Sequence, residues 1–150
     1  MGDANNDDLR VSFDSRLKLK LLGSQITTDA GLLAYRELDE AIRLTEMADD
    51  LFRDSRLGSN KQHRLLPLLR QSIYSRLAGY EDVNDAERLS VDPAMRHVVG
   101  GRAALADKRA ASTSEVGRFE TEIINTSSNL KKLMDLSGEW IDKGQQRKPP

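Results

Sequence analysis

The chain has 150 residues, of which 38% are hydrophobic and 31% charged, and its formal net charge is -1. This composition suits one soluble domain. The near-neutral charge argues against a uniformly basic nucleic-acid binder, so any such binding must rest on local patches. The absence of cysteine excludes disulfides, thiol nucleophiles and thiolate metal sites. No apolar run approaches the roughly 20 residues of a membrane span. We therefore expect a cytoplasmic protein without a membrane partner.

The amino-terminal residues have the two-residue period of β-strands. Apolar and polar side chains alternate over residues 9–13 and again over 17–21, and Asp14-Ser15-Arg16 lies between the two runs. This pattern predicts a small hairpin at 9–22 that ends before Gly23. Residues 1–8 are polar and acidic, which predicts a disordered start without a secretory signal.

From Thr28 onward the spacing of apolar residues changes to that of helices. Thr28 is the expected N-cap of a first helix, and a second helix is expected to begin near Thr45. Polar residues 53–61 read as a loop. The inward residues are predicted to be Leu32, Leu33, Leu38 and Ile42 in the first helix, and Met47, Leu51 and Phe52 in the second.

The third helix has the broadest apolar stripe in the chain. It is predicted to begin at Leu65 or Leu66 and to end at Ala78-Gly79, because Pro67 is tolerated only in the first turn of a helix. Its stripe consists of Leu65, Leu66, Leu69, Ile73, Tyr74 and Leu77.

The second half of the chain carries several helix-start signals. Asn84 or Asp85 is expected to cap a short helix, Asp92-Pro93 to begin another that stops at Gly100-Gly101, and Ser112 to Glu115 to form a capping box. Residues 102–109 suggest a weak Ala-rich helix, and residues 127–143 a last helix. The predicted buried side of that last helix holds Leu130, Leu133, Met134, Leu136, Trp140 and Ile141, and residues 144–150 have the makeup of a linker.

The search for catalytic motifs is mostly negative. No glycine-rich phosphate loop is present, and His63 and His97 lack a partner at a diagnostic spacing, which favours structural or surface roles. The carboxylates Glu81, Asp82, Asp85 and Glu87 could be read as a metal cluster. Helix caps and a solvated turn beside Arg88 are the favoured interpretation of these carboxylates.

A basic stretch gives nucleic-acid binding a modest physical basis. Arg96, Arg102, Lys108 and Arg109 give a local excess of three positive charges over Asp107. The segment 102–120 can be read as a helix-turn-helix with Thr113, Ser114, Glu115 and Arg118 early on a recognition helix. The competing interpretation is a packing helix that buries Val116 and Phe119. A second basic cluster, Lys131, Lys132, Lys143, Arg147 and Lys148, is interpreted as solvated surface.

An ordered set of short motifs covers nearly the whole chain. It comprises Val11–Asp14, Thr28–Leu33, Arg36–Asp39, Leu69–Gln71, Leu77–Leu89, Asp92-Pro93 and Ser112–Glu120. Together these motifs resemble the amino-terminal region of bacterial insertion-sequence transposases of the group-one DDE family. The resemblance implies a mainly α, multi-helix domain with a small hairpin. It further implies a cut-and-paste transposase that binds double-stranded DNA at the inverted-repeat ends of its element. DNA phosphoryl transfer would be performed by an RNase-H-like domain with divalent metal, Mg²⁺.

In that family the first catalytic Asp lies on an apolar strand beyond a linker similar to Arg147–Pro150, and this sequence contains no such strand. We therefore expect a truncated protein, inactive alone, with no catalytic residue, metal ligand or cofactor. Residues 9–143 would form the helical domain, and 144–150 a linker toward the missing catalytic domain. The expected DNA contacts are Arg102, Lys108, Arg109, Thr113, Ser114 and Arg118. The alternative is a protein-interaction or oligomerisation fragment that docks to, or inhibits, full-length transposase.

Overall fold

The computed structural model of the chain describes residues 9–14, 16–19, 28–56 and 62–146. This part is mainly helical, as predicted, and contains seven α-helices. The helices are α1 (Gly31–Ile42), α2 (Leu44–Leu51), α3 (Leu65–Leu77), α4 (Ala86–Leu89), α5 (Pro93–Val99), α6 (Thr113–Arg118) and α7 (Ser127–Gln146). Short 3₁₀ turns, η1 (Thr28–Ala30), η2 (Val83–Asp85) and η3 (Gly101–Ala104), precede or follow them, and a π-helical segment, η4 (Phe119–Ile124), continues α6.

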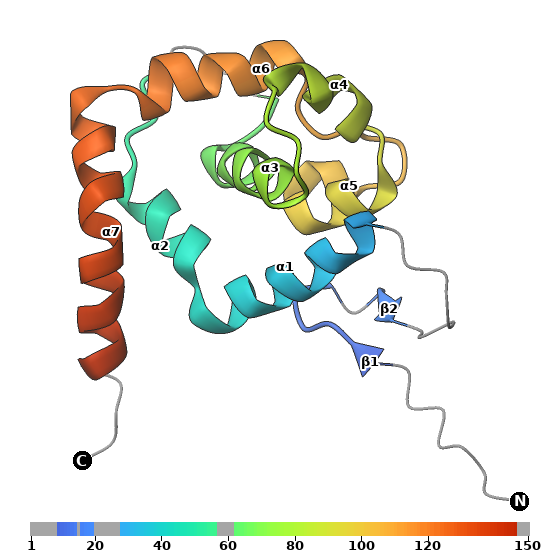
Figure 1. Cartoon of the computed structure of the whole chain (residues 1–150), viewed down its shortest axis with the longest axis horizontal. Helices are drawn as coiled ribbons and strands as arrows, with labels where there is room; N and C mark the ends of the chain where they lie inside the picture. The colour runs from blue at the N-terminus through green and yellow to red at the C-terminus, as the bar shows by residue number, and fades with distance from the viewer. Residues whose placement is uncertain (1–8, 15, 20–27, 57–61, 147–150) are drawn as a thin grey trace, which may run out of the picture.

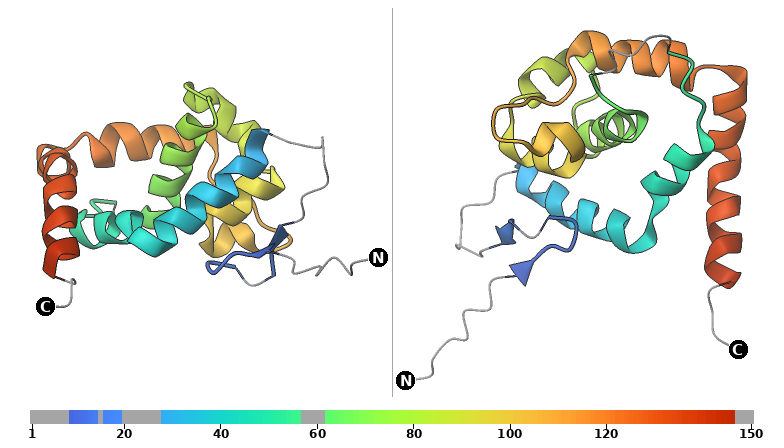
Figure 2. Two further views of the ribbon diagram at one scale, coloured as in Figure 1. Left: turned by 60° about the horizontal axis from the view of Figure 1, so that its bottom comes forward. Right: turned by 180° about the vertical axis from the view of Figure 1, so that it is seen from behind.

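Helix α3 is the central element around which the others are arranged. Figure 1 views α3 end-on, with α1 and α2 below it, α5 to its right, α6 above it and α7 at the left edge. Helix α3 contacts α2, α5 and α6, whereas α7 contacts α2 and η4. The view from behind in Figure 2 shows α7 standing beside α2 at the edge of the molecule. Helix α7 is therefore the most peripheral helix of the described fold.

Two apolar clusters lie on opposite sides of α3. One joins α2, α3, α6, η4 and α7, and its largest fully buried side chains are Phe119, Leu68 and Ile123. The other joins α1, α3, α4 and α5 around Tyr74, Met95 and Val98. Burial of aliphatic and aromatic side chains such as these contributes about 1.5–3 kcal/mol each. Because α3 contributes to both clusters, its register sets the positions of α2, α5 and α6, the helices that it contacts.

The start of α3 confirms the prediction made from Pro67. The helix begins at Leu65 and ends at Leu77, so that Pro67 occupies its first turn, where no intrahelical N–H donor is lost. Leu65, Leu69 and Tyr74 are buried as predicted, but Leu77 is half exposed. The predicted stripe therefore lies on the buried face of α3, but the burial of that face ends about one turn before Leu77.

Helix α1 differs from the prediction in its first residue and in its buried face. It begins at Gly31 after η1, and its N-cap residue is Ala30 rather than Thr28. Leu32 is buried, but Leu38 is 54% exposed, and the other buried residues are Arg36 and Asp39. The apolar spacing missed this face because polar side chains occupy it, and they are stable there because each has charged or hydrogen-bonding partners.

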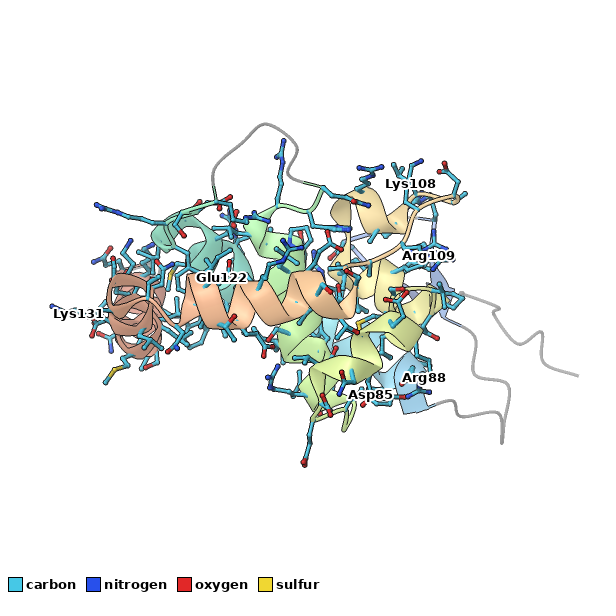
Figure 3. All side chains as sticks on the ribbon, turned by 90° about the horizontal axis from the view of Figure 1, so that it is seen from above. Asp85, Arg88, Lys108, Arg109, Glu122 and Lys131 are labelled. Atoms are coloured by element: carbon cyan, nitrogen blue, oxygen red, sulfur yellow. The ribbon has the colours of Figure 1, made fainter. Side chains whose placement is uncertain are left out.

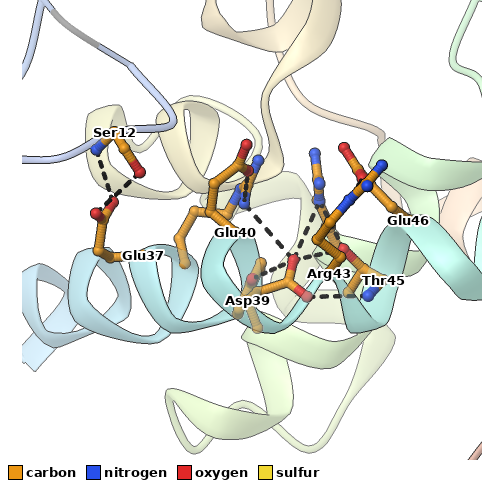
Figure 4. A network of polar contacts seen from close by, with 10 residues as sticks. Ser12, Glu37, Asp39, Glu40, Arg43, Thr45 and Glu46 are labelled. Carbon is orange, nitrogen blue, oxygen red and sulfur yellow. Dashed lines mark hydrogen bonds and ion pairs between the residues drawn. The ribbon is translucent and has the colours of Figure 1, made fainter. Parts of the chain in front are cut away.

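Asp39 connects α1, α2 and α3 through its carboxylate. Its Oδ1 accepts a hydrogen bond from the Thr45 N–H at 2.9 Å, and its Oδ2 accepts bonds from the hydroxyls of Thr45 and of Tyr74, the latter at 3.2 Å. The guanidinium nitrogens of Arg36 and Arg70 each lie 3.6 Å from Oδ2. Figure 4 shows Asp39 at the centre of these contacts. Burial and the Asp39 charge both raise the pKa of Tyr74 above its ordinary value.

A hairpin extending over 9–22 is not supported. The described strands, β1 (Leu9–Arg10) and β2 (Lys18–Leu19), have two residues each and pair antiparallel, with Leu9 opposite Leu19. Residues 1–8 and 20–22 lie outside the described residues. The turn lies where it was expected, with the Leu17 N–H donating to the Asp14 carbonyl at 3.0 Å. Ser12 fastens this segment to α1, because its N–H and hydroxyl both donate to the Glu37 carboxylate, at 2.8 and 2.9 Å.

The last helix is longer than predicted and far less buried. Helix α7 runs to Gln146, so residues 144–146, expected to begin a linker, are helical, and 147–150 lie outside the described residues. Of the six residues predicted to be inward, only Leu136 is buried, and Trp140 is partly buried. Leu130, Leu133, Met134 and Ile141 are exposed. None of the helices in the described ranges has both the length and the apolar character needed to cross a membrane.

Candidate nucleic-acid interface

Helix α6 begins with the predicted capping box. Both Ser112 and Glu115 take part: the Ser112 N–H and hydroxyl each donate to Glu115 Oε2 at 2.9 Å, and the Ser112 side chain accepts from the N3 backbone N–H. The segment before α6 is fixed by the fully buried Gln71. Its Oε1 accepts a hydrogen bond from the Ala111 N–H at 2.8 Å, and its Nε2 donates to the Ala111 carbonyl at 2.7 Å. The start of α6 is thereby held firmly against α3.

Helix α6 uses one side to pack against the core. Val116 and Phe119 are 3% and 1% exposed, as the packing interpretation requires. Glu120 in η4 then binds α3, because its carboxylate accepts from Arg76 at 2.7 Å and from the Ser72 hydroxyl at 2.6 Å. The remaining side of α6 carries Ser114 and Arg118, both exposed. Only this outer side of α6 is available to a ligand.

The predicted helix over 102–109 is not formed. Only the start of that segment, in η3, is helical, and residues 105–112 are turn and irregular backbone. The helix-turn-helix interpretation of 102–120 is therefore wrong. The turn is instead held by Arg96, whose guanidinium donates to the Ala103 carbonyl at 3.0 Å and to the Leu105 carbonyl. Arg96, counted in the basic stretch, thus has a structural role.

The six predicted DNA contacts differ in how free they are. Arg102 and Arg118 are exposed, and no carboxylate among the described residues forms an ion pair with either. Lys108 is bound to Asp107 at 2.6 Å, and Arg109 lies 3.9 Å from Glu87. The two predicted contacts with hydroxyl side chains are Thr113 and Ser114. The Thr113 hydroxyl donates weakly to the Asn84 carbonyl at 3.4 Å, and Ser114 is exposed. The unpaired cations are therefore Arg102 and Arg118.

Arg102 lies near the first turn of α6. The buried His63 has its Nε2 3.9 Å from Glu115 Oε1, and the charge of Arg102 contributes to lowering the pKa of this histidine. Glu115 and Arg118 are three residues apart and so are neighbours on the helix surface. Arg102 is thus within electrostatic range of His63, and Arg118 is a helix neighbour of Glu115, whose carboxylate lies 3.9 Å from that histidine.

Arg88 is a further exposed cation that the sequence search did not assign to the interface. In Figure 3, Arg88, Arg109 and Lys108 lie at one end of the molecule, whereas Lys131 lies at the opposite end. The Arg88 guanidinium stacks on the Tyr80 ring at 4.7 Å and lies 3.9 Å from Asp85. In the second basic cluster, Lys132 is used structurally, donating to the Leu51 carbonyl, and Arg147 and Lys148 lie outside the described residues.

Both histidines have structural surroundings, as expected. His97 Nδ1 lies 3.1 Å from Asp14 Oδ2, a contact across 83 residues that no local spacing reveals. His63 is 4% exposed, and its Nε2 has no hydrogen-bond partner in the described part of the chain. Burial is the main cause that lowers the pKa of His63, because the charged imidazolium loses hydration there.

The lowered pKa of His63 predicts a loss of stability in mild acid. Both folded and unfolded states hold neutral His63 above pH ~6.5, but below it the unfolded state binds a proton more readily. The free energy of unfolding should therefore fall as the pH drops from about 6.5, and His63→Gln should flatten this slope. Urea unfolding of both proteins across this range is the measurement. Equal slopes would contradict a buried neutral histidine.

The carboxylates at 81–87 serve a turn, as favoured from the sequence. Asp85 is the N-cap residue of α4, one of the two predicted, although its side chain makes no capping hydrogen bond. Asp82 caps the preceding turn η2, because its side chain accepts from the Asn84 N–H at 2.9 Å. Asp92 caps α5 as predicted, accepting from the Met95 N–H at 2.7 Å. Across the described ranges no three His, Asp or Glu side chains are grouped so as to hold a metal ion. These residues do not fit the Mg²⁺ site that two-metal phosphoryl transfer requires, and no catalytic step is assigned to them.

The comparison with protein families covers residues 9–150, which match the model of the transposase DDE domain, group 1. The chain matches no curated protein and no solved structure. The family match extends from β1 through α7 and includes both the packed side of α6 and the exposed arginines beside it. The chain therefore belongs to the group 1 DDE transposase family.

Proposed function

We propose that this chain supplies the part of a DDE transposase that binds double-stranded DNA at the inverted-repeat ends of its element. The observation that carries the proposal is the exposure of Arg102 and Arg118 beside α6 without an ion-pair partner among the described residues. An exposed arginine without a carboxylate gains more from a DNA phosphate or a guanine edge than one already paired. Membership of a transposase family makes DNA the natural ligand of such side chains.

The other cations of this end support the proposal by their position. Lys108 and Arg109 lie in the irregular segment after η3, and Arg88 shares their end of the molecule in Figure 3. Lys108 is paired through the neighbouring Asp107, and Arg109 is 3.9 Å from Glu87, so both can exchange an exposed carboxylate for a phosphate at small cost. Thr113 and Ser114 add hydroxyl groups between these cations and Arg118. The arrangement favours backbone contacts with few base-reading groups.

Binding to the repeat and to a scrambled duplex of the same length tests this function. Gel-shift titration at low salt should give tighter binding to the repeat, with an affinity for both that falls as salt rises. The salt dependence follows from release of counterions by the cations named above. Equal and negligible binding to both duplexes at low salt would overturn the proposal.

Two single replacements should separate base reading from phosphate contact. We expect Arg118→Ala to weaken the free energy of binding to the repeat by about 1–3 kcal/mol and to reduce the preference of the chain for the repeat over the scrambled duplex. Lys108→Ala should weaken binding to both duplexes alike and lower the salt slope by about 1. Lys131→Ala, at the opposite end of the molecule, is the matched control. The assignment fails if Lys131→Ala weakens binding as much as Arg118→Ala does.

A second candidate function, self-association, is favoured by the exposed apolar face of α7. Leu130, Met134 and Ile141 recur at helical spacing and are 39%, 80% and 50% exposed. We infer that α7 pairs antiparallel with α7 of a second copy, which sets Leu130 against Ile141. The same register brings Lys131 beside Asp142 of the other copy, so the face is complementary to itself, as a two-fold interface requires. Such pairing would also allow docking to full-length transposase.

Light scattering after size exclusion, without DNA, tests the pairing. The chain should elute as a dimer that dissociates on dilution, and Met134→Glu should shift it to monomer. Ser128→Glu adds the same charge to an exposed position of α7 on its polar side and should leave the dimer intact. A strict monomer at all concentrations would count against this candidate while leaving DNA binding untouched.

A further inference from the structure

A polar cavity of about 430 Å³ lies between the 12–16 segment, α1, α3 and the turn after α5. Its wall includes three arginines, Arg16, Arg36 and Arg70, together with His97 and one carboxylate, Asp14. No residue assigned to the DNA interface lines it, although Gly101 adjoins Arg102 in the sequence. The composition of this wall is unusual because two of the arginines are buried.

The two buried arginines have more donors than the described residues can satisfy. Arg36 and Arg70 are 5% and 6% exposed. Arg36 donates to Glu40 at 2.7 Å through Nη1, whereas its buried Nε has no acceptor in the described ranges. Arg70 donates through Nε to the Thr45 hydroxyl at 3.0 Å, and no described acceptor bonds its terminal nitrogens. A buried guanidinium donor without an acceptor, such as Arg36 Nε, is costly, so an acceptor from outside would be stabilised there.

The nearby carboxylates are already engaged. Asp39, behind the cavity, accepts from Thr45 and Tyr74. Asp14 accepts from Arg16 Nε at 2.9 Å and Nη2 at 2.7 Å and contacts His97, and these hydrogen bonds hold its pKa well below its usual range. The three positive charges around the cavity are equal in number to the nearby negative charges, which belong to Asp14, Asp39 and Glu40. What the cavity offers is thus a surplus of hydrogen-bond donors rather than of net charge.

Two glycines line the cavity, and one of them, Gly100, leaves it open toward Arg70. Gly100 and Gly101 have φ values of +75° and +59°, which residues with side chains rarely adopt. A Cβ atom at Gly100 would lie 3.7 Å from Arg70 Nη1. Because Gly100 has no side chain to cover it, the Arg70 guanidinium itself forms part of the cavity wall. Burial, and then the charge of Arg36, lower the pKa of Arg70, and an anion would relieve that repulsion.

We propose that this cavity binds a phosphate group through Arg36 and Arg70. A phosphate has several oxygens in a tetrahedral arrangement and accepts the forked hydrogen bonds of guanidinium groups. It can therefore satisfy donors of both arginines at once, which a halide cannot. The group would come from inorganic phosphate or from nucleic acid. The inference does not rest on DNA binding by Arg102 and Arg118, which lie outside the cavity.

Thermal unfolding of the whole chain with inorganic phosphate, at constant ionic strength set by chloride, tests the site. A bound ligand raises the melting temperature in a saturable way. Arg36→Lys keeps the charge but removes Nε and the fork, and is expected to weaken the apparent phosphate affinity at least ~10-fold. Arg16→Gln, at a 60% exposed side chain, frees the Asp14 charge to repel the anion, so it should also weaken binding without endangering the core. Lys143→Gln, at an exposed position of α7 outside the cavity, is the control. Stabilisation no greater than with chloride, or equal in all variants, would overturn the site.

A competition experiment distinguishes the two sources of phosphate. If the group belongs to nucleic acid, inorganic phosphate should displace a DNA duplex more strongly than chloride at equal ionic strength, and Arg36→Lys should abolish that difference. If the ligand is free phosphate, DNA affinity should respond only to ionic strength while the saturable stabilisation persists. Loss of DNA binding in Arg118→Ala with retained phosphate stabilisation would separate this site from the proposed interface.

Discussion

Replacing Asp39 with alanine is expected to lower the free energy of unfolding by about 3–5 kcal/mol, because it leaves buried partners without their carboxylate. Arg36 and Arg70 would lose the anion that lies 3.6 Å from each of them. The Thr45 N–H and the Tyr74 hydroxyl would also lose their acceptor. Contacts among α1, α2 and α3 should weaken together, since this single side chain links all three.

Urea unfolding measures this effect, with Asp50→Ala as the matched control. Asp50 is an exposed carboxylate of α2, so its removal should change stability by no more than ~0.5 kcal/mol. Asp39→Asn should fall between the two, since an amide oxygen can still accept from Thr45. Near-equal stabilities of the Asp39 and Asp50 variants would show that the buried network does not hold the three helices together.

Phe119→Ala should lower the free energy of unfolding by about 3–5 kcal/mol, as truncation of a buried aromatic side chain does. Phe119 is 1% exposed and belongs to the cluster that joins α6 to α2, α3 and α7. The loss includes both the transfer free energy of the ring and the cavity left behind. A large value is what a packing helix requires, whereas a helix that only reads DNA would tolerate the change.

Glu122→Ala provides the comparison for Phe119, because Glu122 is exposed on the same η4 segment. Denaturant unfolding should show a small change for Glu122→Ala and a shifted midpoint for Phe119→Ala. DNA binding by folded Phe119→Ala, measured well below its midpoint, should persist. A stability change below ~1 kcal/mol for Phe119→Ala would contradict the packed position of α6.

Local signals predicted the helices whose boundaries depend on neighbouring residues. The Pro67 argument located the start of α3, the Asp92-Pro93 pair located α5, and Ser112 with Glu115 located α6. Each rests on a cap or on the missing N–H of proline, which acts within one helical turn. Such features can be read from a single sequence.

What the sequence did not reveal depends on contacts between distant residues. The burial of Arg36 and Asp39 requires Arg70 and Tyr74 from α3, and the position of His97 depends on Asp14, 83 residues away. Residues 102–109 are rich in alanine, yet Arg96 bonds the carbonyls of Ala103 and Leu105, and Gln71 fixes Ala111 just beyond the stretch. Tertiary hydrogen bonds outweighed the weak helix propensity of that segment.

The apolar pattern of α7 was overinterpreted for a physical reason. Periodicity identifies a face without saying what covers it, and only Leu136 of the predicted residues is buried against the described fold. In the candidate interface, the sequence proposed the cationic residues, but only the structure separated the arginines that form no described ion pair from those that are engaged. Arg96 and Lys108 are engaged by a carbonyl and by a carboxylate, whereas Arg102 and Arg118 form no ion pair within the described ranges, and Arg118 Nε only donates to the Ser114 carbonyl at 3.3 Å.

The most direct test of DNA binding by this chain is the affinity of the wild type and of the Arg102→Ala/Arg118→Ala double variant for the inverted-repeat duplex at low salt. Fluorescence anisotropy should show salt-sensitive binding by the wild type and a loss of about 1–3 kcal/mol for each arginine in the double variant. Lys131→Ala should bind like the wild type. Undiminished binding by the double variant, with unfolding curves that confirm an intact fold, would contradict the interface beside α6.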